Sequence, residues 1–372
     1  MKYVTEKKNV KTERFALFSI LTFLISSLLA IAISEVTIRV LVPEETFWPI
    51  SNIYHKSTND DVVYTNRPNF RGTAFGVSLE TNELGFRGEN WSKQKSPEVF
   101  RIVLIGDSHA FGFGVEFKDT VGEALERILN SKNNASVEVL NFGVNGYNAL
   151  QLKAVFNDIA LSYQPDLVLL LPTNNDHNPA LRVNDDGWLH WDGNPGNDRS
   201  RIVDKSISKT KHGDSPGILK NSHLYLYLKL QLKRRAGGND HEVEKDQIDD
   251  SSQSKPGWMA SFPSGPVSER LQTTVYEPLH DILTTLDEKN IPVVIASYSS
   301  HLDYRQMLRI LEQQFDVPHV ELLTLFPEAK NFSELVAKFG LDWDSHLNAV
   351  AHKRWAEAIA QKIQDNSLLP SQ

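Results

Sequence analysis

From residue 101 onward, short apolar runs alternate with amphipathic segments, and this alternation limits the folds that the chain can adopt. Runs typical of strands lie at residues 101–105, 137–140, 166–171, 291–296 and 319–322. The run "DLVLLL" at 166–171 is almost continuously apolar, as expected where helices cover both faces of a parallel sheet. Amphipathic helices are predicted between the runs and at the C-terminus, from apolar residues at helical spacing, among them Leu125, Leu129, Leu152, Val155, Ile282, Leu286, Trp355 and Ile359.

This alternation predicts an α/β fold class, a three-layer α/β/α sandwich around a mostly parallel sheet. The pattern Thr120 to Glu123 predicts a capping box at the start of the first helix of the domain.

Polar groups follow three of the strands directly. The tripeptide Gly106-Asp107-Ser108 ends the first strand, Gly146 lies in "NFGVNGYN" after the second, and Asn175 lies in "TNND" after the third. The carboxyl ends of parallel strands share one edge of a sheet, so we expect these groups to lie close together. Taken singly, Gly146 fits a simple turn and Asn175 a simple loop, so their placement together is what indicates a site.

A serine at this edge needs a base to become a nucleophile. His346 lies in "DWDSHLNAVAHKRWAEAIA", just before the last helix, and Asp344 stands two residues upstream. Ser108, His346 and Asp344 then fit the nucleophile, base and orienting group of a serine hydrolase. In the alternative interpretation, Asp342, Asp344 and Asn348 cap the last helix and His346 is a loop residue.

The four blocks, in this order, resemble those of the SGNH/GDSL hydrolase family, and "NELGFRGENW" and "EVFRIVLIGDS" resemble its membrane-anchored bacterial branch. The resemblance covers about residues 60–176 and 268–362 and implies a flavodoxin-like sandwich. It implies catalytic roles for Ser108, His346 and Asp344. It also implies an oxyanion hole made by the N–H groups of Ser108 and Gly146 and the side-chain amide of Asn175.

Two positions depart from the family pattern. The third block usually begins with glycine, whereas this chain has Thr173. The last block is often Asp-x-x-His, whereas here the spacing is Asp-x-His. This shorter spacing resembles the branch that includes periplasmic polysaccharide acetylation proteins. Asp344 is therefore the first choice for the orienting carboxylate and Asp342 the second.

The N-terminus carries an uncharged apolar run of 19 residues, Phe15 to Ile33. A helix of that length, at about 1.5 Å per residue, nearly spans a hydrocarbon core of roughly 30 Å. Basic residues precede the run, and only Arg39 follows closely. This asymmetry predicts a cytoplasmic tail at 1–14, a transmembrane signal anchor at 15–33 and an extracytoplasmic remainder. The alternative is a cleaved signal peptide ending near Ala30-Ile31-Ala32, although its apolar region is usually about 7–15 residues long.

After the anchor, residues 34–99 form an irregular lead-in to a domain at 100–366. The domain contains a polar insertion at 177–222, with a hairpin expected around Asp186-Gly187, and a segment at 237–257 expected to be a mobile loop. On the hairpin, Trp188 and Trp191 fit either stacking on sugar rings or cross-strand packing.

Composition excludes several classes of function. The chain has no cysteine, which excludes disulfides, thiolate catalysis and cysteine-based zinc sites. Its formal net charge is −8, so nucleic acid is not an expected partner. His109, His177 and His352 lack the spacing of metal ligands, and we expect neither a metal nor a cofactor.

The sequence therefore predicts a serine esterase that hydrolyses an O-acyl ester on the periplasmic side of a bacterial inner membrane. Its expected partners are an ester-bearing substrate, such as an acylated glycan or lipid, and the membrane through the N-terminal helix. One alternative is an O-acyltransferase acting on a cell-surface or secreted polysaccharide. Another is a non-catalytic glycan-binding protein on the same scaffold.

Overall fold

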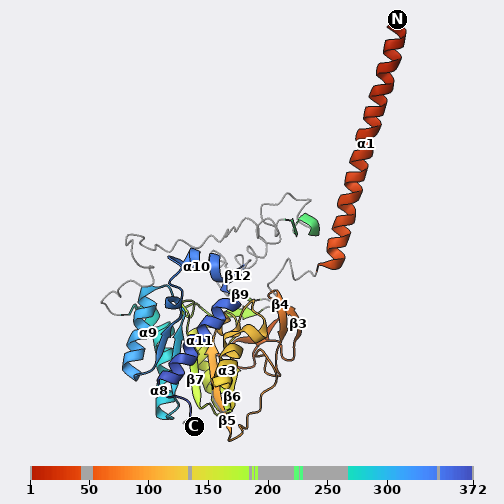
Figure 1. The fold of residues 1–372 in the computed structure, drawn as a ribbon. Coiled ribbons are helices and arrows are strands. Elements are labelled where there is room, and N and C mark those ends of the chain that lie inside the picture. Colours follow the sequence, from red (N-terminus) through yellow and green to blue (C-terminus); the bar gives the residue numbers. More distant parts are fainter. Residues whose placement is uncertain are drawn as a thin grey trace.

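The computed structural model describes residues 2–42, 53–132, 136–183, 187, 189–191, 222–225, 227–228, 267–341 and 344–370. The first helix, α1 (Lys2–Leu41), projects away from the rest of the described chain (Figure 1). The most apolar 18 residues within Phe15–Leu41 have a mean hydropathy of 2.5 and are not buried against the domain. By length and composition this helix fits a membrane anchor or a signal sequence.

The centre of the domain is a five-stranded sheet in which every neighbouring pair is parallel. The strand order is β11-β10-β7-β5-β6. The strands are β5 (Val99–Gly106), β6 (Ser136–Asn141), β7 (Leu167–Leu171), β10 (Val293–Ser297) and β11 (His319–Glu321). The five strands predicted from the apolar runs are confirmed.

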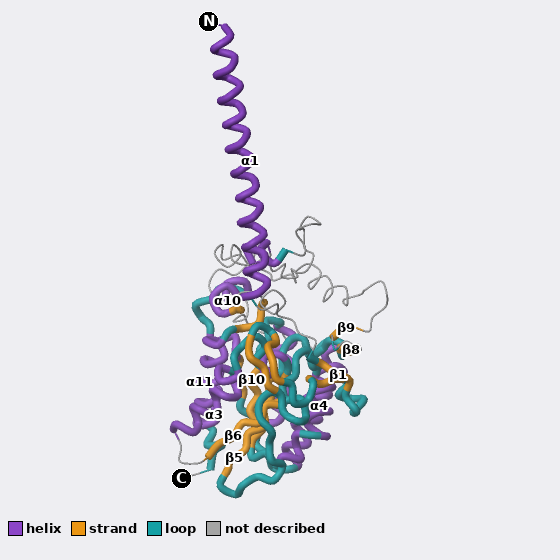
Figure 2. Tube along the Cα trace, turned by 90° about the vertical axis from the view of Figure 1, so that its right-hand side faces the viewer, coloured by secondary structure: helices purple, strands orange, loops and turns teal. Residues whose placement is uncertain are grey.

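Helices cover both faces of this sheet, which confirms the three-layer sandwich. One face packs on α3 (Val121–Lys132), α10 (Phe332–Phe339) and α11 (Ala349–Asp365). The other packs on α4 (Ala149–Asp158), α8 (Glu277–Glu288) and α9 (Leu302–Phe315). Figure 2 shows α3 and α11 on one side of the strands and α4 on the other. A short helix α7 (Glu269–Leu271) and a π-helical turn (Gln272–Tyr276) lead directly into α8.

Alternate side chains of β5 enter the two different cores. Ile102 and Leu104 pack with the α3 and α11 side, whereas Val103 and Ile105 pack with the α4 and α8 side. Because side chains alternate across a strand, a sheet covered on both faces needs apolar residues at consecutive positions. This is why the apolar runs predicted the strands correctly.

Four antiparallel pairs of short strands surround the sandwich. They are β1 (Tyr54–Lys56) with β2 (Tyr64–Asn66), β3 (Arg71–Ala74) with β4 (Val77–Glu80), β8 (Leu181–Val183) with β9 (Leu189–Trp191), and β12 (Gly340–Leu341) with β13 (Asp344–Leu347). The pairing of β8 with β9 confirms the predicted hairpin. Asp186, Trp188, the side chain of Trp191, residues 237–257 and most of 177–222 lie outside the described residues.

The predicted capping box at Thr120 is wrong. The Thr120 hydroxyl donates to the carbonyl of Phe117 at 2.9 Å, and the N–H of Val121 donates to Nδ1 of His352 at 3.1 Å. His352 lies on α11, so a distant side chain satisfies the start of α3. Burial is the main reason that the pKa of His352 falls to about 3, which keeps the ring neutral and able to accept this bond.

Candidate active site

Ser108 lies where β5 turns into the short helix α2 (Ser108–Phe111). Asp107 caps α2, since its Oδ1 accepts the N–H of His109 at 2.9 Å. The turn is tight: a Cβ on Gly106 would lie 2.7 Å from Cβ of Ala110, so glycine is needed there. This turn places Ser108 at the carboxyl edge of the sheet, as the sequence predicted, and at the first position of a short helix.

His346 and Asp344 come to Ser108 on β13. The Ser108 Oγ and His346 Nε2 atoms are 2.7 Å apart, and Nδ1 of His346 hydrogen-bonds to Oδ1 of Asp344. The same Asp344 oxygen accepts the backbone N–H of His346 at 2.9 Å. The alternative interpretation, in which these polar residues cap the last helix, is correct for Asn348, which caps α11. Asp342 lies outside the described residues.

The charges around His346 favour a base. Burial alone would lower the pKa of His346, but the Asp344 carboxylate outweighs it and the pKa is raised. His109, whose ring centroid lies 5.0 Å from that of His346, has its pKa lowered by burial. Of these two rings, His346 is therefore the one that takes up a proton more readily.

Asp107 is ionised although it is fully buried. Burial favours its neutral form, but its interactions with His109 and Thr173 outweigh burial and lower its pKa to about 2. The carboxylate lies beside the nucleophile, with Oδ2 at 3.4 Å from Ser108 Oγ.

The loop that carries Gly146 is held by aromatic hydroxyls from the lead-in and from the loop itself. Tyr64 donates its hydroxyl proton to the carbonyl of Asn145 at 2.8 Å, and Tyr147 donates to the carbonyl of Tyr64 at 2.7 Å. Gly146 has a φ of +74°, and an added Cβ would lie 2.7 Å from Cδ1 of Leu181. Both facts require glycine at this position.

Asn175 follows β7 in a loop at the same sheet edge. The backbone N–H of Ala149 donates to the carbonyl of Asp176 at 3.1 Å, which joins this loop to the end of the Gly146 loop. Thr173 joins it to the nucleophile turn, since its Oγ1 lies 2.9 Å from Oδ2 of Asp107. The three strand ends predicted to form one site are therefore connected to one another.

The histidines considered as metal ligands have other surroundings. His352 caps α3, His109 packs between His346 and Tyr298, and His177 lines a cleft. Within the described part of the chain, no group of three His, Cys, Asp or Glu side chains is placed to hold a metal ion.

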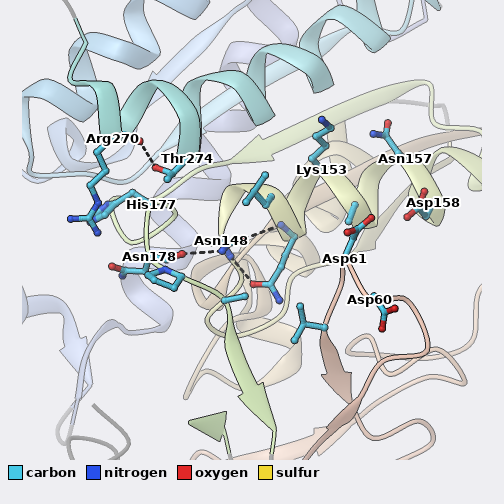
Figure 3. Close-up of a pocket in the computed structure, with 16 residues that line it drawn as sticks. Asp60, Asp61, Asn148, Lys153, Asn157, Asp158, His177, Asn178, Arg270 and Thr274 are labelled. Carbon is cyan, nitrogen blue, oxygen red and sulfur yellow. Dashed lines mark hydrogen bonds between the residues drawn. The ribbon is translucent and has the colours of Figure 1, made fainter. Parts of the chain in front are cut away.

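The cleft beside His177 has a volume of about 620 Å³ and was not predicted from the sequence. Its wall includes Asn148, which caps α4, and Lys153 of α4, with Arg270 and His177 at one end and Asp60 and Asp158 at the other (Figure 3). Ser108, His346 and Asp344 are not among its lining residues.

A second Ser–His–acid arrangement occurs elsewhere in the domain. Ser297 Oγ lies 2.7 Å from Nε2 of His319, whose Nδ1 lies 3.0 Å from a carboxylate oxygen of Glu312. Only 2% of the His319 side chain is exposed, against 25% for His346. The His346 ring is thus the more exposed of the two, although His319 and Glu312 also line a small surface cleft of about 210 Å³. Ser297 therefore serves as a matched control for Ser108.

No family model matches the chain, and no curated protein matches it. Solved structures do. A lipolytic protein of the G-D-S-L family from Desulfitobacterium hafniense matches at 13% identity, over 71% of this chain and 99% of its own, with a TM-score of 0.38. A lipase/acylhydrolase from Enterococcus faecalis matches at 13%, over 73% and 98%, with a TM-score of 0.39. A catalytic mutant of an acetylxylan esterase from Geobacillus stearothermophilus matches at 14%, over 73% and 96%, with a TM-score of 0.37.

The chain is similar to SGNH/GDSL hydrolases. Among the matched structures, one is described as a protein of the G-D-S-L family and another as an SGNH-hydrolase family esterase. At these identities the likeness concerns the arrangement of the chain, and the chemistry has to be argued from the side chains of the site.

Proposed function

We propose that this chain is a serine esterase of SGNH/GDSL type that hydrolyses an O-acyl ester outside the cytoplasm. The observation that carries the proposal is a pair of hydrogen bonds, one between Ser108 Oγ and His346 Nε2 and one between His346 Nδ1 and Asp344. The His346 side chain is also 25% exposed. A serine hydroxyl is a weak nucleophile until an adjacent base accepts its proton, and this arrangement supplies that base.

In the proposed reaction, Ser108 Oγ attacks the ester carbonyl while His346 Nε2 takes the hydroxyl proton. The resulting imidazolium is stabilised by the Asp344 carboxylate, which also keeps Nδ1 protonated. His346 then returns the proton to the leaving alcohol, and an acyl group remains on Ser108. Water, deprotonated by His346, attacks this acyl-enzyme and releases the acid.

The negative charge that develops on the carbonyl oxygen needs hydrogen-bond donors. We assign the backbone N–H groups of Ser108 and Gly146 and the Nδ2 amide of Asn175 to this role. Ser108 is the first residue of α2, so its N–H is not used within the helix. Donors fixed in advance around a developing oxyanion usually contribute the largest single share of the rate enhancement.

The proposed location rests on α1. Its basic flank at the N-terminus and its apolar length support a signal anchor with the domain on the far side of the cytoplasmic membrane. An ester-bearing glycan or lipid at that surface is the substrate class we propose.

The test is ester hydrolysis by the full-length chain in detergent, with an aryl acetate as substrate. Ser108→Ala should lower kcat by a factor on the order of 10⁶, because it removes the nucleophile and little volume. Ser297→Ala should keep the wild-type rate, since only 2% of the side chain of its partner His319 is exposed. Equal measurable rates for wild type and Ser108→Ala would refute Ser108 as the nucleophile, and no hydrolysis by the wild type would leave a non-catalytic binding protein as the better description.

A further inference from the structure

Thr173 occupies the position where the third family block usually has glycine. It follows β7, its side chain is fully buried, and its backbone bridges to Tyr298 beside β10. A buried hydroxyl needs hydrogen-bond partners to offset the loss of water. The partners that Thr173 has are side chains of the site itself.

Three side-chain oxygens surround the Thr173 hydroxyl. Oδ2 of Asp107 lies at 2.9 Å, Oδ1 of Asp176 lies at 3.2 Å, and Oδ1 of Asn175 is also within hydrogen-bonding distance. Asp107 adjoins the nucleophile, and Asn175 is the proposed oxyanion donor. Thr173 therefore stands between the two loops that must cooperate in the reaction.

The number of protons on Thr173 and Asp176 limits which of these oxygens can donate a hydrogen bond and which must accept one. A hydroxyl has one proton to donate and two lone pairs with which to accept. Oδ2 of Asp176 already accepts the backbone N–H of Thr173 at 2.9 Å and the hydroxyl of Tyr304 at 2.8 Å. Burial raises the pKa of Asp176 well above its usual range, which favours the neutral form of this carboxyl.

Because Oδ2 already accepts two hydrogen bonds, a neutral Asp176 would carry its proton on Oδ1 and donate it to Thr173 Oγ1. The single Thr173 proton then points away from Asp176, toward Asp107 Oδ2 and Asn175 Oδ1. One proton shared between two acceptors is a three-centre bond. It holds the oxygen end of the Asn175 amide at Thr173 and leaves the nitrogen end, Nδ2, for another acceptor.

We propose that Thr173 is a positioning residue that orients the side-chain amide of Asn175, holding Oδ1 so that Nδ2 faces the developing oxyanion. Without the hydroxyl, the two ends of the amide are nearly equivalent in shape, and the amide can turn over. An amide turned over presents an oxygen to the oxyanion, which repels the charge that the site has to stabilise. The proposal rests on the proposed function, since it acts through Asn175 on the reaction at Ser108.

The test compares kcat and KM for Thr173→Val, Thr173→Ser and Asn175→Ala on one aryl ester, using the full-length chain. Thr173→Val keeps the shape and removes the proton donor, whereas Thr173→Ser keeps the hydroxyl. We expect Thr173→Val to lower kcat at least about 10-fold, up to the roughly 10²–10³-fold loss from removing an oxyanion donor. KM should stay near the wild-type value because the charge develops only on attack, and Thr173→Ser should restore most of kcat.

A double-mutant cycle separates this role from a structural one. If Thr173 acts through the amide, Thr173→Val added to Asn175→Ala should cause little further loss of kcat, because the group it orients is gone. A full additional loss in the double variant, or wild-type kcat in Thr173→Val, would overturn the proposal. Should Thr173→Val not fold, Thr173→Gly removes the hydroxyl without adding volume and takes its place.

Measuring Ser108→Ala beside these variants distinguishes failure of the proposed function from failure of the proposed role of Thr173. Wild-type activity in Ser108→Ala overturns the proposed function. An inactive Ser108→Ala together with a fully active Thr173→Val overturns only the role of Thr173.

Discussion

Replacing Asp344 by asparagine separates the charge of this carboxylate from its hydrogen bonding. In the structure one oxygen, Oδ1, accepts both the backbone N–H and the Nδ1–H of His346. An asparagine can place its amide oxygen at the same point. The backbone N–H fixes that orientation, because the amide nitrogen there would bring two donors together.

The expected magnitude follows from what is kept and what is lost. Asp344→Asn keeps the His346 tautomer and loses the attraction between carboxylate and imidazolium. At a charge separation of about 4 Å and an effective dielectric constant between 20 and 80, that attraction is about 1–4 kcal/mol, or about 5-fold to 10³-fold in kcat. Asp344→Ala loses the tautomer control as well, and a wrong tautomer costs about 10⁴ in kcat.

The assay is a pH–rate profile for both variants on one aryl ester. Because only neutral His346 accepts a proton, activity falls as the pH drops below its pKa. The Asp344 charge holds that pKa above the usual 6.5, so the acidic limb should move to lower pH in Asp344→Asn. Equal damage from the two substitutions would refute the reasoning about the shared oxygen, and an unmoved limb would show that Asp344 does not raise the pKa of His346.

Three further predictions concern other parts of the chain. Asn175→Ala should lower kcat by about 10²–10³ with little change in KM, whereas Asn174→Ala should be mild; a larger loss in Asn174→Ala would shift the third block by one residue. Because His352 has a folded pKa of about 3 and an unfolded pKa near 6.5, the unfolded state binds more protons between these values. The free energy of unfolding should therefore fall as the pH is lowered from 6.5, by up to about 1.4 kcal/mol per pH unit. Thermal unfolding of His352→Gln at several pH values should show a weaker dependence of stability on pH than the wild type. The same dependence in both proteins would contradict this. A phosphatase reporter fused after residue 60 should be active outside the cytoplasm and fractionate with membranes, whereas a reporter active only in the cytoplasm would contradict the orientation.

The sheet could be predicted from the sequence because its signal is local. Strands covered on both faces need consecutive apolar residues, and the run at 166–171 shows this directly. The start of α3 could not be predicted in the same way. Its acceptor, His352, is 231 residues from Val121, and no local pattern indicates that contact.

Some residues of the site could likewise be predicted from local sequence patterns and others could not. Ser108, Gly146 and Asn175 each follow a strand, so the topology of a parallel sheet predicts their shared edge. The role of His346 is predicted from the carboxylate of Asp344 two residues upstream and from the family resemblance. The partners of Thr173 could not be predicted, because Tyr304 reaches Asp176 across 128 residues and the burial of that carboxyl depends on the assembled cores.

The arrangement of Ser297, His319 and Glu312 also lacked a sequence signal. Its members come from β10, β11 and α9 and meet only after these elements pack. That a chain can form such an arrangement around a histidine side chain only 2% exposed shows why hydrogen-bond connectivity alone does not identify a nucleophile.

Covalent trapping with a fluorophosphonate identifies the nucleophilic residue, which we propose to be Ser108. The full-length chain is treated with a fluorophosphonate, digested and analysed by mass spectrometry. The account predicts a single adduct on Ser108 that forms far more slowly in His346→Ala, because the hydroxyl then has no base. An adduct on Ser297 or on any other residue, with Ser108 unmodified, would contradict it.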